Sequence, residues 1–124
     1  MNITYPHQGS KLGLSVECED YLSGAALSAK GKKYIEGLLA RADDAKKFAA
    51  KHLLETYNDA WADGDDYPPL DAPGFIAKLT LKGISIQEDP DAGSMLFDDG
   101  DMFGGHTVVI DFDELEPDDA NLVS

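Results

Sequence analysis

Residues 2–18 alternate between apolar and polar side chains in two runs that are separated by a short polar stretch. In the first run Ile3 and Tyr5 alternate with polar neighbours, and the stretch from His7 to Ser10 has the composition of a turn. The apolar residues of the second run are Leu12, Leu14, Val16 and Cys18. Because successive side chains of a strand point to opposite faces, this period of two predicts an N-terminal β-hairpin whose second strand lies on a core. Cys18 is then interpreted as a small buried strand residue.

From about Ala25 to Ala62 the apolar residues recur at spacings of three and four, which indicates amphipathic helix. The apolar stripe consists of Tyr34, Ile35, Leu38, Leu39, Ala42, Ala45, Phe48, Ala49, His52, Leu53, Tyr57, Ala60 and Trp61. One helix over the whole segment would be unusually long, so we predict a break near Arg41 to Asp44, where Asp43 or Asp44 can cap a second helix. The segment is interpreted as two helices or one bent helix. His52 lies on the stripe and is predicted to be a partly buried, hydrogen-bonded core residue.

The period of two returns after a connection rich in Asp, Pro and Gly that extends from Ala62 to Gly74. Alternating apolar residues, interrupted by Gly83, then predict a strand pair or a bulged strand; they are Phe75, Ala77, Leu79, Leu81, Ile84 and Ile86. Two further strands are predicted at Ser94 to Phe97 and at His106 to Phe112, and turns are predicted at Pro90 to Gly93 and at Asp98 to Gly105. Residues 113–124 have little periodicity and are predicted to be a loosely ordered acidic tail.

This order of elements predicts one α+β domain over residues 1–124. It consists of an N-terminal β-hairpin, two central helices or one bent helix, and a C-terminal antiparallel β-meander. The helices are expected to pack on one face of the sheet, because a half-buried antiparallel sheet needs a cover for its apolar side.

Negative charge is concentrated in the second half of the chain. The formal net charge is −14, from 24 acidic and 10 basic residues. Residues 1–58 contain eight Lys or Arg and seven Asp or Glu, whereas residues 59–124 contain two and seventeen. Such a surface repels nucleic acid and anionic membranes, so the charge implies either a basic protein partner or none. Neither a signal peptide nor an apolar run long enough to span a membrane is present, which predicts a cytoplasmic protein.

The sequence gives little support for a metal site or a cofactor site. The segments around Asp89 and Asp98 are acidic, but their spacing does not match a calcium loop, and Asp and Gly are also favoured by tight turns. Phosphate-binding and dinucleotide-binding motifs are absent, and a single cysteine cannot form an internal disulfide. We therefore expect no metal and no cofactor.

His106 is the histidine best placed for chemistry, because it opens a strand beside several acids. One alternative is therefore a small hydrolase or metal-assisted enzyme centred on His106 and the turn from Asp98 to Asp101. No nucleophile in a recognisable arrangement accompanies this histidine, so capping of the turn is the favoured interpretation.

A partner-binding surface is the other interpretation of the acidic segments. Trp61 and Tyr67 flank three aspartates, and aromatic rings can anchor a partner whose Lys and Arg side chains meet carboxylates. The alternative, which the sequence favours, is that Trp61 closes the core at the helix end while the acids solvate a loop. The candidate partner-binding residues are Trp61, Asp63, Asp65, Asp66, Tyr67, Asp98, Asp99, Asp101, Phe103 and His106.

The second half also resembles a loose group of small bacterial families of unknown function. The residues that carry the resemblance are Ile84-Ser-Ile86, Leu96-Phe97, Phe103 and the Gly105-His106 step before a strand. Some members of the group are similar to immunity proteins of polymorphic-toxin or contact-dependent inhibition systems. The resemblance implies an N-terminal strand region, central helices and a C-terminal meander, and it supplies no catalytic residues.

Together, charge and resemblance favour a non-enzymatic acidic binding protein, an immunity-type inhibitor that neutralises a basic toxin domain. A third hypothesis is a housekeeping domain that forms homo-oligomers through the edge of its sheet.

Overall fold

The computed structural model describes residues 2–7, 9–24, 26–62, 68–87 and 92–123. Within these residues the longer strands form a six-stranded sheet in the order β1-β2-β5-β6-β7-β8, and β3 and β4 form a small separate pair. The strands are β1 (Asn2–His7), β2 (Ser10–Val16), β3 (Leu22–Ser23), β4 (Ala26–Leu27), β5 (Thr80–Ile86), β6 (Ala92–Asp98), β7 (Thr107–Asp113) and β8 (Glu116–Val123). The helices are a 3-10 turn (Glu19–Tyr21), α1 (Ala29–Ala40), α2 (Ala42–Thr56), a π-helical turn (Tyr57–Trp61) and α3 (Ala72–Lys78).

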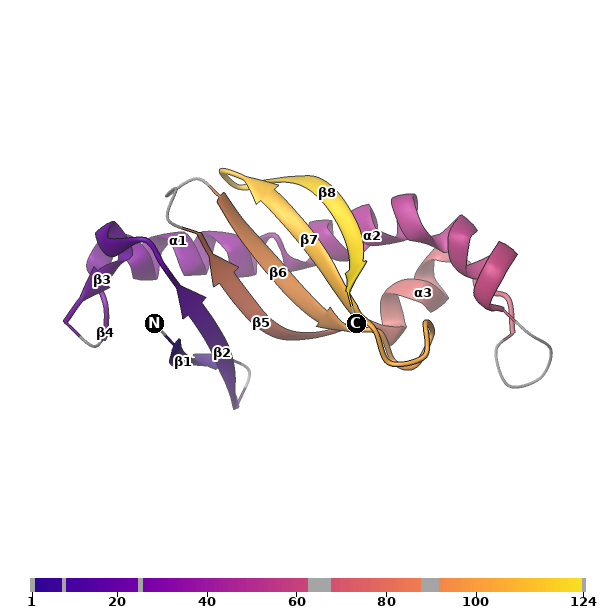
Figure 1. Ribbon diagram of the computed structural model, residues 1–124, viewed down its shortest axis with the longest axis horizontal. Coiled ribbons are helices and arrows are strands. Elements are labelled where there is room, and N and C mark those ends of the chain that lie inside the picture. The colour runs from indigo at the N-terminus through magenta and orange to yellow at the C-terminus, as the bar shows by residue number, and fades with distance from the viewer. Residues whose placement is uncertain (1, 8, 25, 63–67, 88–91, 124) are drawn as a thin grey trace.

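The sheet is antiparallel except at one junction. β1 and β2 form the predicted N-terminal hairpin, and β2 then pairs with β5 in parallel. β5, β6, β7 and β8 follow one another as antiparallel neighbours, so the predicted C-terminal meander is present and also includes β8, in the segment that was predicted to be a tail. α1 and α2 lie behind the sheet in the view of Figure 1.

The predicted helix break is confirmed at Arg41, between α1 and α2. Its local chemistry differs from the prediction, because the N-cap residue of α2 is Arg41 and no side chain caps the helix. Asp43 and Asp44 lie in the first turn, where carboxylates favour the positive end of the helix, and Asp44 also contacts the Arg41 guanidinium at 3.4 Å. α1 is capped at its own start by the Ser28 hydroxyl, which accepts the Gly31 N–H.

Three predictions about individual segments are wrong. Residues 72–78 form α3 instead of a strand, because Asp71 caps the Gly74 N–H at 2.8 Å and Pro73 stands in the first turn. Residues 116–123 are not a loose tail but form β8, which pairs with β7. His52 is exposed, and its ring packs on that of Phe48 at 4.2 Å instead of entering the core. Cys18 is buried as predicted, just beyond the end of β2.

The core lies between the helices and the strands. Ile35 and Leu38 of α1 and Ala45 and Ala49 of α2 are fully buried in one cluster with inward residues of the sheet. The fit is close at Gly93 of β6, since an added Cβ would come within 2.9 Å of the Tyr34 hydroxyl. The predicted turn from Asp98 to Gly105 connects β6 to β7 at the end of this core.

Candidate partner-binding surface

The turn between β6 and β7 is organised by one buried carboxylate. Asp99 is 0% exposed. Its Oδ1 accepts the N–H of Asp101 at 2.9 Å, and its Oδ2 accepts the N–H groups of Phe103, Gly105 and His106 at 3.0, 3.2 and 2.9 Å. Backbone N–H groups that converge in this way form a concavity for an anion, and here the anion is a side chain of the same turn.

The glycines of the turn make this convergence possible. Gly100, Gly104 and Gly105 have φ values of 58°, 74° and 89°, and Asp101 has φ 65°. L side chains rarely adopt this conformation, but glycine adopts it freely and Asp tolerates it. Asp98 adds a second local bond, in which its Oδ2 accepts the Gly100 N–H at 3.2 Å.

Phe103 fixes the turn to the helices. Its side chain is 0% exposed. Its ring makes edge contacts with those of Tyr57, Trp61 and Phe75, with centroid distances of 5.7, 5.5 and 6.2 Å. Edge-to-face pairs of this kind stabilise beyond the area that they bury. The turn is therefore held from inside by a carboxylate and an aromatic ring.

Trp61 reaches the turn because α2 ends in a π-helical turn, a feature frequent at functional sites. The side chain of Asn58 holds the chain beyond it, with Oδ1 accepting the Leu70 N–H at 2.9 Å and Nδ2 donating to the Leu70 carbonyl at 3.0 Å. Trp61 is 37% exposed, and its ring lies edge-on to that of His106 at 5.5 Å. A large aromatic side chain is thus presented to solvent next to the turn.

His106 is only half-buried, and its Nδ1 contacts the Phe103 carbonyl oxygen within the same turn. The ring orientation is therefore set by the backbone of the turn. Among the described residues, no group of three or more His, Cys, Asp or Glu side chains could hold a metal ion.

The predicted partner-binding residues divide into three groups. Trp61, Asp98, Asp101 and His106 lie at the surface around the turn, and we call them the turn surface. Asp99 and Phe103 were predicted to be part of the contact surface, which is wrong, because both are buried and hold the turn from inside. The predicted residues Asp63, Asp65, Asp66 and Tyr67 lie outside the described part of the chain.

The charges of the two layers differ in sign. Residues 92–123, which form β6, the turn, β7 and β8, contain nine Asp or Glu and neither Lys nor Arg. Residues 29–56, which form α1 and α2, contain seven Lys or Arg and four Asp or Glu. The turn surface therefore belongs to the acidic part of a molecule whose helices are mildly basic.

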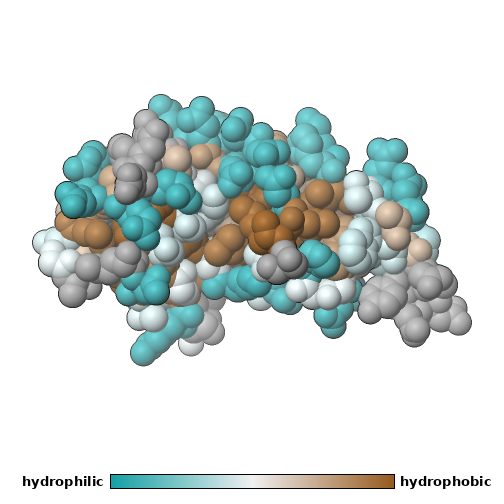
Figure 2. Space-filling view, in the orientation of Figure 1, coloured by the Kyte–Doolittle hydropathy of each residue, from teal (hydrophilic) through white to brown (hydrophobic). Residues whose placement is uncertain are grey.

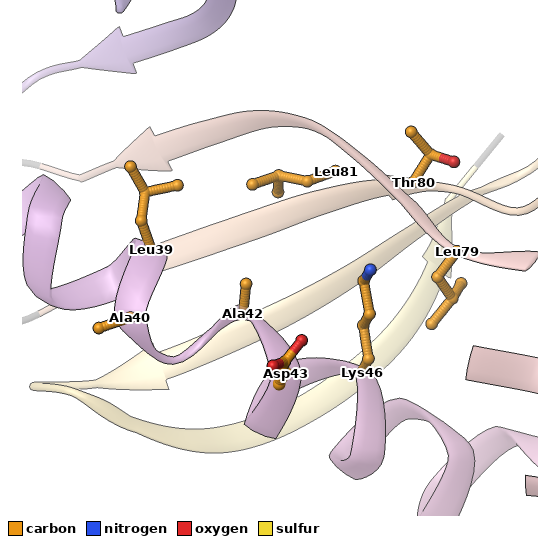
Figure 3. A pocket seen from close by; sticks show the side chains of 8 residues that line it. All are labelled: Leu39, Ala40, Ala42, Asp43, Lys46, Leu79, Thr80 and Leu81. Atoms are coloured by element: carbon orange, nitrogen blue, oxygen red, sulfur yellow. The ribbon is translucent and has the colours of Figure 1, made fainter. Parts of the chain in front are cut away.

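Several hollows lie on the surface of the described residues. The hollow in Figure 3 encloses about 350 Å³ between the junction of α1 with α2 and the start of β5, and the Lys46 side chain extends across it toward the strand. Its walls include Leu39, Leu79 and Leu81, and none of the predicted partner-binding residues lines it. A second hollow of about 460 Å³ borders the turn and is lined in part by Asp101. We assign no chemistry to either.

The sequence of the chain matches a bacterial protein family. Residues 2–121 match a family described as an uncharacterized protein conserved in bacteria (DUF2262). The chain belongs to the DUF2262 family. The match includes the whole turn surface and nearly all of β8. The bacterial part of the resemblance is thereby confirmed, and the description of DUF2262 does not mention immunity proteins or toxins.

No curated protein and no solved structure matches this DUF2262 chain. Within the described residues, every helix is too short or too polar to cross a membrane.

Sequence reasoning found the turn but missed how it is built. An Asp that directly follows a strand and precedes glycine is a known turn signal, and it could have identified Asp99 as an acceptor of local N–H groups. The π-helical turn and the pairing of Asn58 with Leu70 had no comparable signal, because both depend on where the chain returns after α2.

Proposed function

We propose that this DUF2262 protein is a non-enzymatic acidic binding protein, and specifically a cytoplasmic immunity-type inhibitor that neutralises a basic toxin domain. The observation that carries the proposal is the separation of charge, with nine acidic and no Lys or Arg residues in 92–123. A toxin that acts on nucleic acid presents Lys and Arg to phosphates, and an inhibitor can occupy that surface with carboxylates. Opposite potentials also accelerate the encounter of the two proteins.

The turn surface has the composition of a small interface. Trp61 is an exposed aromatic anchor, and Asp98 and Asp101 are exposed carboxylates beside it. Tightly bound partners commonly concentrate their binding energy on a few aromatic side chains surrounded by polar residues. Because Asp99 and Phe103 already fix the backbone of the turn, little ordering entropy is lost when a partner binds.

Two contacts support this proposal over the hydrolase alternative. Both carboxylate oxygens of Asp99 accept backbone N–H groups, and the Nδ1 of His106 contacts the Phe103 carbonyl oxygen. The groups that a general acid and base would need are thus engaged in holding the turn.

Co-expression with the product of the adjacent upstream gene tests the proposal. We expect that gene to encode a basic toxin domain, the wild type to restore colony formation, and the purified pair to form a complex. The double variant Asp98→Asn and Asp101→Asn should bind roughly tenfold more weakly, because it removes two interface charges. Asn can keep the local hydrogen bond of Asp98 and tolerates the positive φ of Asp101, so the turn should persist.

The matched control is the double variant Asp43→Asn and Glu55→Gln. It changes the net charge by the same amount on exposed positions of α2, and it should protect cells as the wild type does. Survival without a complex, or the absence of any toxicity to rescue, would count against the inhibitor proposal.

A further inference from the structure

The sheet has one face that the core does not use. In β7, Val108, Ile110 and Phe112 are buried, while Val109 and Asp111 alternate with them and are only half-buried. Paired residues of neighbouring strands share a face, so Leu96 of β6, directly opposite Val109, lies on this outer face as well. It is the face turned toward the viewer in Figure 1, with α1 and α2 behind it.

Apolar side chains lie close together on this outer face. Leu96 and Val109 are directly paired, and Val123 of β8 lies diagonally from Val109, because its own partner is Thr107. Val123 is 46% exposed. Figure 2 shows the corresponding hydrophobic area over β6 and β7 beside the end of β8, bordered by hydrophilic side chains.

Carboxylates surround these apolar residues. Asp98 lies opposite Thr107 at one end of the face, and Asp111 and Asp119 lie directly opposite each other toward the other end. Like charges in direct cross-strand register are unfavourable, and a cation placed between them would remove that cost. Asp111 accepts the Ser94 hydroxyl at 2.6 Å, which fixes its side chain at the face.

The outer face also continues into the turn surface. His106 precedes Thr107 in the chain, and Thr107 pairs with both Asp98 and Val123. One basic side chain of the neighbouring strand β5 reaches this corner, where the Lys82 Nζ donates to the Thr107 hydroxyl at 2.6 Å. A partner held at the turn surface would therefore meet the apolar residues of the outer face next.

We propose that the outer face, with the paired Leu96 and Val109, with Val123 beside them, and with Asp98, Asp111 and Asp119 toward its two ends, docks an amphipathic basic helix of the partner protein. The apolar stripe of such a helix covers the three aliphatic side chains, and its Lys and Arg residues reach the carboxylates on either side. This inference rests on the proposed function and extends it, because it specifies the chemistry of the partner segment.

A direct test is a titration of the purified full-length protein with a labelled Leu/Lys peptide that forms an amphipathic helix. Two variants address the two components of the face: Val109→Lys places a cation at the apolar centre, and Asp111→Asn with Asp119→Asn removes the opposed charges. Each should weaken binding roughly tenfold. Asp43→Asn with Glu55→Gln, on exposed positions of α2, should bind as the wild type does.

Several outcomes would overturn the inference. Equal binding of a Ser/Lys peptide with the same charge would show that the apolar centre contributes nothing, and binding to zwitterionic vesicles that is lost in Val109→Lys would assign the face to membranes. If Val109→Lys and Asp111→Asn with Asp119→Asn bind the toxin domain normally while Asp101→Asn, which lies in the turn and not on the outer face, binds it more weakly, the outer face is not the docking site but the proposed function stands. If the toxin domain binds none of these proteins, the proposed function itself fails.

Discussion

Replacement of Asp99 by alanine should destabilise the protein more than replacement of any other acid in the turn. The side chain is fully buried and accepts backbone N–H groups from Asp101, Phe103, Gly105 and His106. Alanine offers no acceptor, so these donors must find water or remain without a partner. The burial of each N–H group decides whether water can replace the lost carboxylate as its acceptor.

The magnitude follows from the accessibility of each donor. The bond to the Phe103 N–H is buried, so its loss leaves a donor that water reaches poorly, which costs about 1–3 kcal/mol. The bonds to Asp101, Gly105 and His106 are only partly buried, and each contributes about 0.5–1 kcal/mol after rehydration. The sum is a loss of about 2.5–6 kcal/mol in the free energy of unfolding, a large effect for one substitution.

Urea unfolding followed by circular dichroism measures this loss for Asp99→Ala, Asp99→Asn and Asp98→Ala. Asn keeps one acceptor oxygen and should lose about half as much as alanine. Asp98→Ala removes one exposed bond of 3.2 Å and should lose at most about 0.5 kcal/mol. Equal stabilities of the Asp99→Ala and Asp98→Ala proteins would refute the role assigned to the buried carboxylate.

Three further predictions concern the rest of the molecule. Gly31→Ala would place a Cβ 2.3 Å from the Tyr21 carbonyl oxygen and should cost about 2–3 kcal/mol in urea unfolding, whereas Gly13→Ala, whose nearest neighbour is 4.0 Å away, should cost nothing measurable. Burial and the nearby Glu36 raise the pKa of Tyr5 above 10.0, so the protein should lose stability as the pH rises through that raised pKa, and Glu36→Gln should lower the pKa in an ultraviolet titration corrected with Tyr5→Phe. Both edge strands, β1 and β8, contain a proline, which hinders edge-to-edge pairing, so sedimentation should give a monomer; a dimer would favour the self-association hypothesis.

The fold could be predicted from the sequence wherever one periodicity dominated. The period of two identified β2 and β7, because in each strand buried side chains alternate with less buried ones. The segment at residues 72–78 was ambiguous, since Phe75 and Leu79 fit both an alternating strand and one face of a helix. The cap by Asp71 and the proline at the first turn decided for the helix.

β8 was missed for a different reason. It is an edge strand with residues that alternate between half-buried and exposed, so it needs few apolar side chains. Its acids and Pro117 gave the appearance of a tail. The register with β7, which fixes its place in the sheet, is a long-range property that no local pattern contains.

The candidate surface was predicted in part. The sequence identified Trp61, Asp98, Asp101 and His106, which the fold brings to the surface around the turn. It could not separate them from Asp99 and Phe103, because an acid and an aromatic residue in a turn can point either way. Only the convergence of the backbone N–H groups and of the rings shows which of them are buried.

The most direct test of the proposed acidic binding surface is the ionic-strength dependence of its affinity for the product of the adjacent upstream gene, which is the proposed toxin partner. Calorimetry at 50 and 300 mM NaCl should show a Kd that rises at least about tenfold, because salt screens the attraction between carboxylates and Lys or Arg. Asp98→Asn with Asp101→Asn should bind more weakly and depend less on salt than Asp43→Asn with Glu55→Gln. A Kd that is independent of salt, or equal in the two double variants, would contradict the central claim.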